Sequence, residues 1–137
     1  MIHHISISAH KPLHVAEVLA ELLQGSTFPF SPVPGGFVTV CEDGYRTMVE
    51  VYPLGTEMIP GQNEQDVQFA HVKEPSVYTA THAALSVTLD ETRIKDIAAR
   101  EGWRAVTCDR SGLFKVIEFW IENRIMFELL TPEMAQN

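Results

Sequence analysis

The chain has 137 residues, 45% of them hydrophobic and 20% charged, and a formal net charge of −8. This length and composition are typical of one globular domain with a sizeable core. The acidic balance argues against a nucleic-acid partner, because binding to phosphates requires a basic face and none stands out. No apolar run approaches the roughly 20 residues that a membrane span needs.

The amino terminus lacks the basic segment and long apolar core of a secretory signal. The chain has two cysteines, Cys41 and Cys108, which are too few for a disulfide framework. We therefore expect free thiols, a cytoplasmic location and no membrane contact.

Residues 2–9 largely alternate between polar and apolar side chains, which predicts a half-buried strand. His4 and Ile5 lie on opposite faces of this strand. A helix is predicted over Pro12–Leu23, because proline suits a first helical turn and apolar residues follow at helical spacing.

Residues 27–36 are rich in proline and aromatic side chains, so we expect an irregular wall or an edge segment there. Strands are predicted over 37–42 and 46–52, because a turn-forming Asp-Gly pair separates two β-favouring runs. On the second of these strands Glu50 lies on the face opposite to Val49.

The stretch from about 55 to 78 is polar and contains glycine and proline, and it is long for a simple connection. Such length predicts a linker between two halves or a lid over a site. Residues 67–72 within it are a candidate for an additional short strand.

The second half repeats the order of the first. In the strand expected at 81–88, His82 lies on the face opposite to Leu85. Asp90 is a good N-cap for a helix over Glu91–Glu101, which Gly102 ends. Three further strands are predicted over residues 103–108, 114–121 and 125–130. On the last of them Glu128 has the opposite parity to its apolar neighbours.

The two halves place a histidine and a glutamate at equal spacing. From His4 to Glu50 is 46 positions, and from His82 to Glu128 is also 46. We interpret this as an internal duplication of a βαβββ unit. The predicted fold is α+β, with paired βαβββ modules forming a curled mixed β-sheet trough and the helices on its outer face.

All four of these side chains fall on the face that the helices leave uncovered. Two imidazoles and two carboxylates suit a divalent metal ion such as zinc, nickel, cobalt, manganese or iron. Each residue taken alone is most often a solvated or hydrogen-bonded polar group. The agreement of parity and spacing is what favours one shared metal site.

Three short motifs carry a resemblance to a known family: His-Ile-Ser-Ile at 4–7, Thr-His-Ala-Ala-Leu-Ser-Val at 81–87 and Phe-Glu-Leu-Leu-Thr-Pro at 127–132. With the duplicated βαβββ pattern they resemble the vicinal oxygen chelate superfamily. This superfamily includes glyoxalase I, methylmalonyl-CoA epimerase, extradiol dioxygenases and the bleomycin- and fosfomycin-resistance proteins. The resemblance covers nearly the whole chain apart from the linker.

By position, the resemblance assigns His4, Glu50, His82 and Glu128 to the four metal-ligand positions of the glyoxalase I and epimerase branch. The sequence also departs from that branch. The second strand of module one is expected to be replaced by the proline-rich stretch. The arginine that glyoxalase I carries shortly after its first ligand is a serine here, which argues against glutathione as the substrate.

The resemblance implies a metal-dependent lyase or isomerase that acts on a small carbonyl compound. Two substrate oxygens would chelate the metal, and a glutamate would move the proton, with Glu128 the better candidate for the base and Glu50 the second. The side chains that could line the substrate pocket, or could equally be ordinary core, are Met48, Tyr52, Trp120 and Met126.

Two other functions stay open at this point. A bleomycin-resistance type of protein would bind or sequester a small molecule without catalysis, in an aromatic cleft formed by Phe28, Phe30, Phe37 and Trp120. A non-catalytic member could instead serve interaction or regulation.

The expected organisation is a single domain over 1–137, with module one at about 1–54, a linker at about 55–78 and module two at about 79–132. Because relatives often pair their modules across a dimer, we expect a homodimer. The sequence leaves open whether the metal site forms within one chain or between two.

Overall fold

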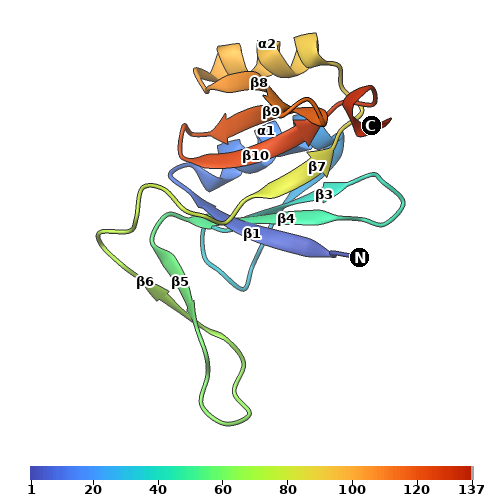
Figure 1. The fold of residues 1–137 in the computed structure, drawn as a ribbon. Helices are drawn as coiled ribbons and strands as arrows, with labels where there is room; N and C mark the ends of the chain where they lie inside the picture. Colours follow the sequence, from blue (N-terminus) through green and yellow to red (C-terminus); the bar gives the residue numbers. More distant parts are fainter. Residues whose placement is uncertain (137) are drawn as a thin grey trace. The chain divides into compact units, whose positions relative to one another are not determined.

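The computed structural model describes residues 1–136, which form two helices, ten strands and a short 3-10 turn at Met134–Gln136 (Figure 1). The strands make two four-stranded sheets and one two-stranded sheet. The chain divides into two compact units. The first comprises residues 1–20 and 25–76, and the second comprises residues 21–24 and the chain from Val77 onward.

The first unit contains the strands and most of the helix of one βαβββ module, with strand order β1-β4-β3-β2. Strand β1 runs parallel to β4, while the other two pairings are antiparallel. A parallel pair needs a crossover connection, and the helix between β1 and β2 begins it. The elements are β1 (His4–Ala9), α1 (Pro12–Leu23), β2 (Gly25–Pro29), β3 (Phe37–Cys41) and β4 (Met48–Pro53).

The second unit repeats this topology, with strand order β7-β10-β9-β8 and a parallel pair formed by β7 and β10. The other two pairings are again antiparallel. The predicted pair of βαβββ modules is therefore confirmed. The elements are β7 (Ala83–Ser86), α2 (Glu91–Glu101), β8 (Ala105–Arg110), β9 (Phe114–Ile121) and β10 (Ile125–Leu130).

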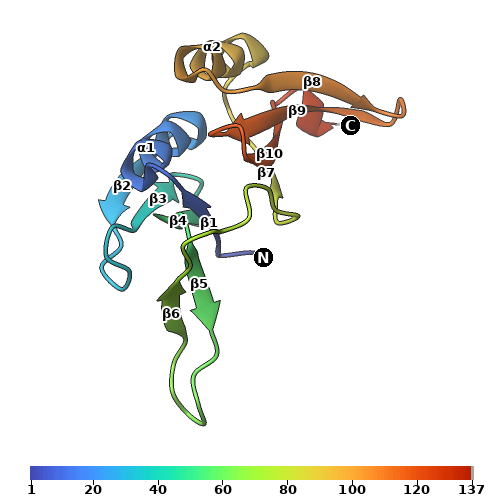
Figure 2. The ribbon, with the colours of Figure 1, turned by 90° about the vertical axis from the view of Figure 1, so that its left-hand side faces the viewer.

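Each sheet buries its apolar face, as the alternation predicts. In the first unit Ile7 and Val51 are buried, as is Val15 of α1. Helix α1 is tied to β3 by the Thr39 hydroxyl, which donates to the Ala16 carbonyl oxygen at 2.6 Å. Figure 2 shows this helix alongside the strands of its own module.

In the second unit the buried residues of β9 and β10 alternate with more exposed ones. Phe119 and Phe127 are opposite each other in the β9–β10 ladder, and both are fully buried. Helix α2 contributes Ile94 and Ile97 to the buried set. The Thr107 hydroxyl of β8 donates to Glu91, which ties the first turn of α2 to the sheet.

The expectation that the proline-rich stretch replaces a strand is wrong, because β2 forms over Gly25–Pro29. It is the edge strand of its sheet, so the missing N–H of Pro29 leaves no gap in a central ladder. A Cβ at Gly25 would come within 2.0 Å of the Val40 carbonyl oxygen, so this approach requires glycine. Of the two expected alternatives, the edge segment is confirmed.

The linker contains a hairpin of its own, β5 (Thr56–Ile59) with β6 (Gln68–His71). The candidate strand at 67–72 is present as β6, whereas β5 had no clear signal in the sequence. The ring of Phe69 meets the ring of Tyr52 edge to face at 5.9 Å, which joins the hairpin to β4. Neither helix within residues 1–136 has the length and apolar character needed to cross a bilayer.

Helix α2 is capped at both ends as predicted. The Asp90 carboxylate accepts a hydrogen bond from the Arg93 backbone N–H at 2.8 Å. Gly102 adopts a left-handed conformation with φ of 72°, and its N–H bonds to the carbonyls of the last turn. The capping bond satisfies a backbone donor that the helix itself cannot use.

Asp90→Ala is therefore expected to lower the free energy of unfolding by about 1 kcal/mol, because the cap is lost. Urea denaturation of wild type and variant measures this change. Asp96→Ala is the matched control, since Asp96 is an exposed residue within the same helix. The control should be neutral or slightly stabilising, because alanine has the higher helix propensity. Equal stabilities for Asp90→Ala and Asp96→Ala would contradict the assignment of the cap.

Candidate metal centre

In module one, the parallel pairing of β1 with β4 brings a histidine beside a glutamate. Ser6 is the residue opposite Glu50 in the ladder, and His4 precedes it by two positions on the same face. The Nε2 atom of His4 lies 3.7 Å from Oε1 of Glu50. The histidine side chain is 48% exposed, whereas the glutamate side chain is 8% exposed.

The second carboxylate oxygen of Glu50 is held by two hydroxyl groups. Ser6 Oγ donates to Oε2 at 3.0 Å, and the Tyr52 hydroxyl donates to the same oxygen at 2.5 Å. Burying a carboxylate without partners is costly, and these bonds offset that cost. They also fix the orientation of the group, so that Oε1 is the oxygen nearest to His4.

Tyr52 is buried, and its surroundings explain why its hydroxyl keeps the proton that it donates to Glu50. Burial raises the pKa of its hydroxyl to about 12, and the hydrogen bond to the Glu50 carboxylate acts in the same direction. Its ring also contacts Phe30 at 5.8 Å between centroids. The structure thus places this predicted substrate-lining residue in direct contact with a predicted metal ligand.

Module two contains the equivalent pair. His82 directly precedes β7, Glu128 lies on β10, and Glu128 is opposite Ala84, two positions after the histidine. The Nε2 atom of His82 is 3.3 Å from Oε1 of Glu128. The Nδ1 atom of His82 lies 3.0 Å from the Ala80 carbonyl oxygen. A carbonyl can only accept a hydrogen bond, so Nδ1 carries the hydrogen.

Two further residues join Glu128 on this face. Arg110 Nη2 is 2.9 Å from Oε2 of Glu118 and 3.7 Å from Oε2 of Glu128. The guanidinium holds the pKa of the Glu118 carboxyl below its usual range. In turn, the hydrogen bond to Glu118 raises the pKa of Arg110. The sequence reasoning missed both residues, although Glu118 has the strand parity of this face and is opposite Glu128 in the ladder.

The two pairs have the geometry of two half-sites. Two ligands that each bind one metal ion at about 2.0–2.2 Å lie roughly 3.0–3.5 Å from each other. The His82–Glu128 separation falls within that range, and the His4–Glu50 separation exceeds it slightly. Among residues 1–136, no group of three or more histidine, cysteine or acidic side chains lies close enough to hold a metal ion. Each module by itself therefore brings together two of the four predicted ligands.

The other predicted pocket residues lie near these pairs on the same strands. Met48 begins β4 and is opposite His4 in the ladder. Met126 of β10 is opposite Trp120 of β9 in the ladder. This pair is two residues along the strands from the pair formed by Glu128 and Glu118. Their parity places them on the face that carries the glutamates.

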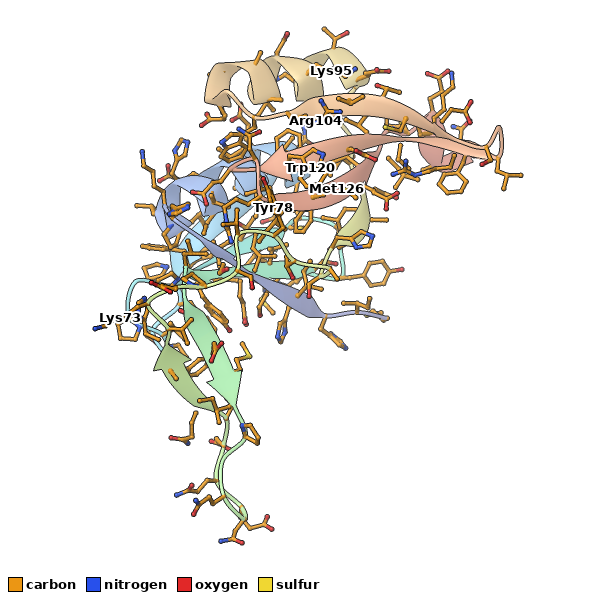
Figure 3. The ribbon with its side chains drawn as sticks, turned by 60° about the vertical axis from the view of Figure 1, so that its left-hand side comes forward. Lys73, Tyr78, Lys95, Arg104, Trp120 and Met126 are labelled. Carbon is orange, nitrogen blue, oxygen red and sulfur yellow. The ribbon has the colours of Figure 1, made fainter. Side chains whose placement is uncertain are left out.

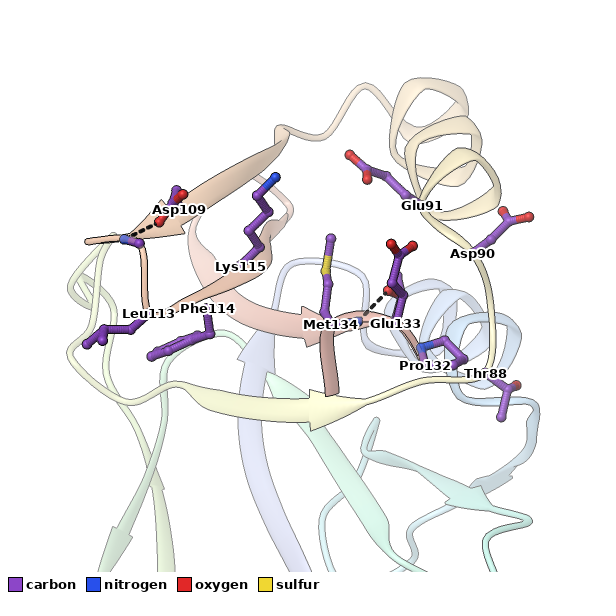
Figure 4. Close-up of a pocket in the computed structure, with 12 residues that line it drawn as sticks. Thr88, Asp90, Glu91, Asp109, Leu113, Phe114, Lys115, Pro132, Glu133 and Met134 are labelled. Atoms are coloured by element: carbon purple, nitrogen blue, oxygen red, sulfur yellow. Dashed lines mark hydrogen bonds between the residues drawn. The ribbon is translucent and has the colours of Figure 1, made fainter. Parts of the chain in front are cut away.

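A cavity of about 630 Å³ in the second unit is lined by residues other than the His82–Glu128 pair (Figure 4). Its lining includes Asp90, Glu91, Asp109 and Glu133, but neither His82 nor Glu128. The first three carboxylates are engaged locally: Asp90 caps α2, Glu91 bonds to Thr107, and Asp109 accepts the Gly112 N–H at 2.5 Å. These bonds explain Asp90, Glu91 and Asp109 as structural groups.

Comparison with known proteins gives a consistent result for the fold. No protein-family model matches the chain, and no curated protein matches it. Among solved structures, the fosfomycin resistance protein FosX from Mesorhizobium loti matches with a TM-score of 0.57 and 14% identity, over 99% of this chain and 94% of that one. A glyoxalase family protein from Bacillus anthracis matches with a TM-score of 0.58 and 13% identity, over 94% of this chain and 92% of that one.

FosX from Listeria monocytogenes, in complex with Mn(II) and a sulfate ion, matches with a TM-score of 0.59 and 13% identity. This match covers 94% of this chain and 87% of that one. At these identities the likeness concerns the fold. The chain has the fold of the vicinal oxygen chelate superfamily, to which these neighbours belong.

The raised pKa of Tyr52 predicts a stability change at alkaline pH. The unfolded chain releases the tyrosine proton near the ordinary value of 10.0, whereas the folded chain retains it up to about 12. The stability from this shift is complete below the lower value and is lost as pH rises towards the higher one. Tyr52→Phe lacks this component, so its unfolding free energy should decline less steeply than that of wild type above pH about 10.

Urea unfolding at a series of alkaline pH values measures the two slopes. Tyr78→Phe is the matched control, because Tyr78 is 68% exposed, and it should follow wild type. Parallel curves for wild type and Tyr52→Phe would show that the hydroxyl of Tyr52 does not make the buried bond to Glu50.

Proposed function

We propose that this protein is a glyoxalase-like, metal-dependent lyase or isomerase that acts on a small carbonyl compound. One divalent metal ion is bound by His4, Glu50, His82 and Glu128. The fold neighbours support a divalent metal, since two of the solved FosX structures contain Mn(II).

The observation that carries the proposal is the arrangement around His82. Its Nδ1–H is engaged by the Ala80 carbonyl, so Nε2 is the atom that faces the Glu128 carboxylate at 3.3 Å. In a neutral imidazole that atom is an acceptor, and an acceptor beside a carboxylate is repelled. A metal ion between the two groups would replace this repulsion by attraction to both. Metal-binding histidines are held in this way, with the other ring nitrogen donating to a carbonyl or carboxylate.

Module one supports the same interpretation with different partners. Oε2 of Glu50 accepts bonds from Ser6 and Tyr52, which leaves Oε1 directed towards His4. Hydrogen bonds to the second oxygen are the usual way to orient a metal-binding carboxylate. Both histidines are half exposed, so an incoming metal ion can reach them.

When bound, the metal ion would polarise a chelated substrate carbonyl and stabilise the negative charge that forms on proton removal. Glu128 is the better candidate for the base. Glu50 is almost completely buried and fixed by two hydroxyl groups, whereas Glu128 has Arg110 3.7 Å from its second oxygen. That guanidinium offers the carboxylate a second position, away from the metal, from which it can take a proton.

Metal binding is tested by thermal unfolding of chelator-treated protein with and without excess zinc, nickel, cobalt or manganese. At a metal concentration of about 100 Kd, wild type should gain roughly 2.7 kcal/mol, which is a rise in Tm of several degrees. His82→Ala and Glu128→Gln should lose most of this rise. Removing a group that only orients a ligand lowers metal affinity by roughly 10–100-fold. Removing the ligand itself should lower the affinity by at least as much.

His14→Ala is the control for this experiment, because His14 is an exposed histidine on α1 outside the proposed ligand set. It should show the wild-type rise in Tm. Equal metal-induced shifts in wild type, Glu128→Gln and His82→Ala would contradict the four-ligand site, and so would the absence of any shift in wild type.

The proposal includes a homodimer in which module one of each chain faces module two of the other, since the chain forms two compact units with two ligands each. A homodimer of His4→Ala lacks a ligand in both of its metal sites, because both chains carry the substitution. The same holds for a homodimer of His82→Ala. In a mixed dimer of the two variants, one site receives both substitutions and the other site keeps all four ligands. We therefore expect refolding of a mixture to restore metal binding to part of the molecules, measured by metal analysis after gel filtration.

Each variant refolded alone is the control and should stay metal-poor. If the mixture binds no more metal than the separate variants, the site is not assembled between chains. Sedimentation analysis of wild type at micromolar concentration gives the oligomeric state independently.

A further inference from the structure

A second cavity of the second unit has a different chemistry from the metal ligands. It has a volume of about 470 Å³ and is lined by Tyr78, Thr79, Arg104, Trp120, Asn123 and Arg124. This volume is in the range of pockets that bind small molecules. Figure 3 shows the labelled side chains of Tyr78, Arg104, Trp120 and Met126 gathered in one region of the second unit.

The β-ladder places this cavity beside the proposed metal ligands. Trp120 follows Glu118 by two positions on β9, and its partner Met126 precedes Glu128 by two positions on β10. Two residues along a strand correspond to about 7 Å, and side chains two apart share a face. The cavity thus lies on the glutamate-bearing face, roughly one side-chain pair away from Glu128.

The cavity is basic in a chain whose net charge is −8. Arg104 is exposed, and among residues 1–136 no carboxylate forms an ion pair with it. Its backbone pairs with that of Trp120, so the guanidinium and the indole arise from directly opposed positions. Arg124 is buried, and Oε1 of Glu122 lies 3.8 Å from its Nη1. The uncompensated charge of Arg104 favours an anionic ligand.

The indole of Trp120 adds a second polar feature. Its Nε1 atom is buried and has no partner within hydrogen-bond distance in the described part of the chain. The Glu118 carboxylate is nevertheless near enough for the indole to contribute to its lowered pKa. The indole therefore links the lining of the cavity to the carboxylate that lies opposite Glu128 in the ladder.

We propose that this cavity binds a planar organic carboxylate. The flat faces of Trp120 and Tyr78 suit an aromatic or conjugated body, and the guanidinium of Arg104 matches a carboxylate through two parallel hydrogen bonds. This assignment rests on the proposed function: the carbonyl end of the substrate is at the metal ion, and the cavity holds the opposite end. Arg104 is two strands across and two residues along from Glu128, which is roughly 12 Å between backbones. The substrate class is accordingly a conjugated carbonyl compound that carries a carboxylate at the end far from its reacting carbonyl.

Calorimetric titration of chelator-treated protein with 2-naphthoate tests the cavity without the metal. Wild type should bind 2-naphthoate, and it should bind neutral 2-naphthamide about tenfold or more weakly, because only the acid pairs with the guanidinium. Arg104→Gln should lose about the same factor for 2-naphthoate and little for the amide. Arg46→Gln removes an exposed arginine of the first unit and is the matched control, with wild-type affinity expected.

Tryptophan emission shows where the ligand binds. Trp103→Phe leaves Trp120 as the single tryptophan, and 2-naphthoate should quench its emission with the affinity found by calorimetry. No quenching, equal affinities for acid and amide, or equal affinities of Arg104→Gln and Arg46→Gln would each overturn the proposal.

Two variants distinguish the proposed metal site from the proposed carboxylate site. His82→Ala should lose the metal-induced rise in Tm and keep its affinity for 2-naphthoate. Arg104→Gln should keep the rise in Tm and lose the affinity. If 2-naphthoate binding fails in both wild type and His82→Ala while metal binding is normal, the carboxylate site is wrong and the metal site remains. If 2-naphthoate binds normally but the metal causes no rise in Tm, the metal site is wrong and the carboxylate site remains.

Discussion

The parallel pairing of the first and last strands in each module places the histidine of the candidate site beside its glutamate. In both modules the glutamate is opposite the residue that follows the histidine by two positions. Side chains two apart share a face, so this register places imidazole and carboxylate together. A parallel pair also requires a long crossover. In each module the crossover includes a helix on the apolar face, which leaves the polar pair on the other face.

The two modules keep the same pair but differ in what surrounds it. Module one has Ser6 and Tyr52 beside its glutamate, and both donate to Glu50. At the equivalent positions module two has alanine and leucine, so Glu128 receives no hydroxyl from them. Its second oxygen instead lies near Arg110. One carboxylate is thus fixed in a buried network while the other keeps an alternative partner. This asymmetry suits a site in which one glutamate only binds metal and the other also moves a proton.

The sequence allowed the helices and most strands to be predicted because their signals are local. Pro12 at the start of α1, and Asp90 and Gly102 at the ends of α2, set their boundaries through backbone groups within one turn. Strand β2 was missed because the turn-like composition after it dominates the local pattern. The edge position that tolerates Pro29 is a property of the whole sheet.

For the site, parity was sufficient to pair each histidine with its glutamate. It did not predict the near-complete burial of Glu50, which depends on hydroxyl donors from two strands. The role of Arg110 was also hidden, since its contact with Glu118 and Glu128 depends on the register of the β8–β9 hairpin. How two modules would be arranged around the proposed metal ion depends on contacts between distant parts of the chain, which strand periodicity does not encode.

The half-site character of each module gives a physical reason for the duplication. A divalent metal ion such as zinc usually takes three or four protein ligands, and one module offers only a histidine and a glutamate. A single module therefore presents one carboxylate and one imidazole nitrogen, which is half of the proposed ligand set. Two modules together supply two imidazoles and two carboxylates, which is a complete ligand set. Because each half-site is already oriented by its own carbonyl, hydroxyl or guanidinium partners, little ordering remains to be done when the metal binds. The same reasoning holds whether the second module comes from the same chain or from another copy of it.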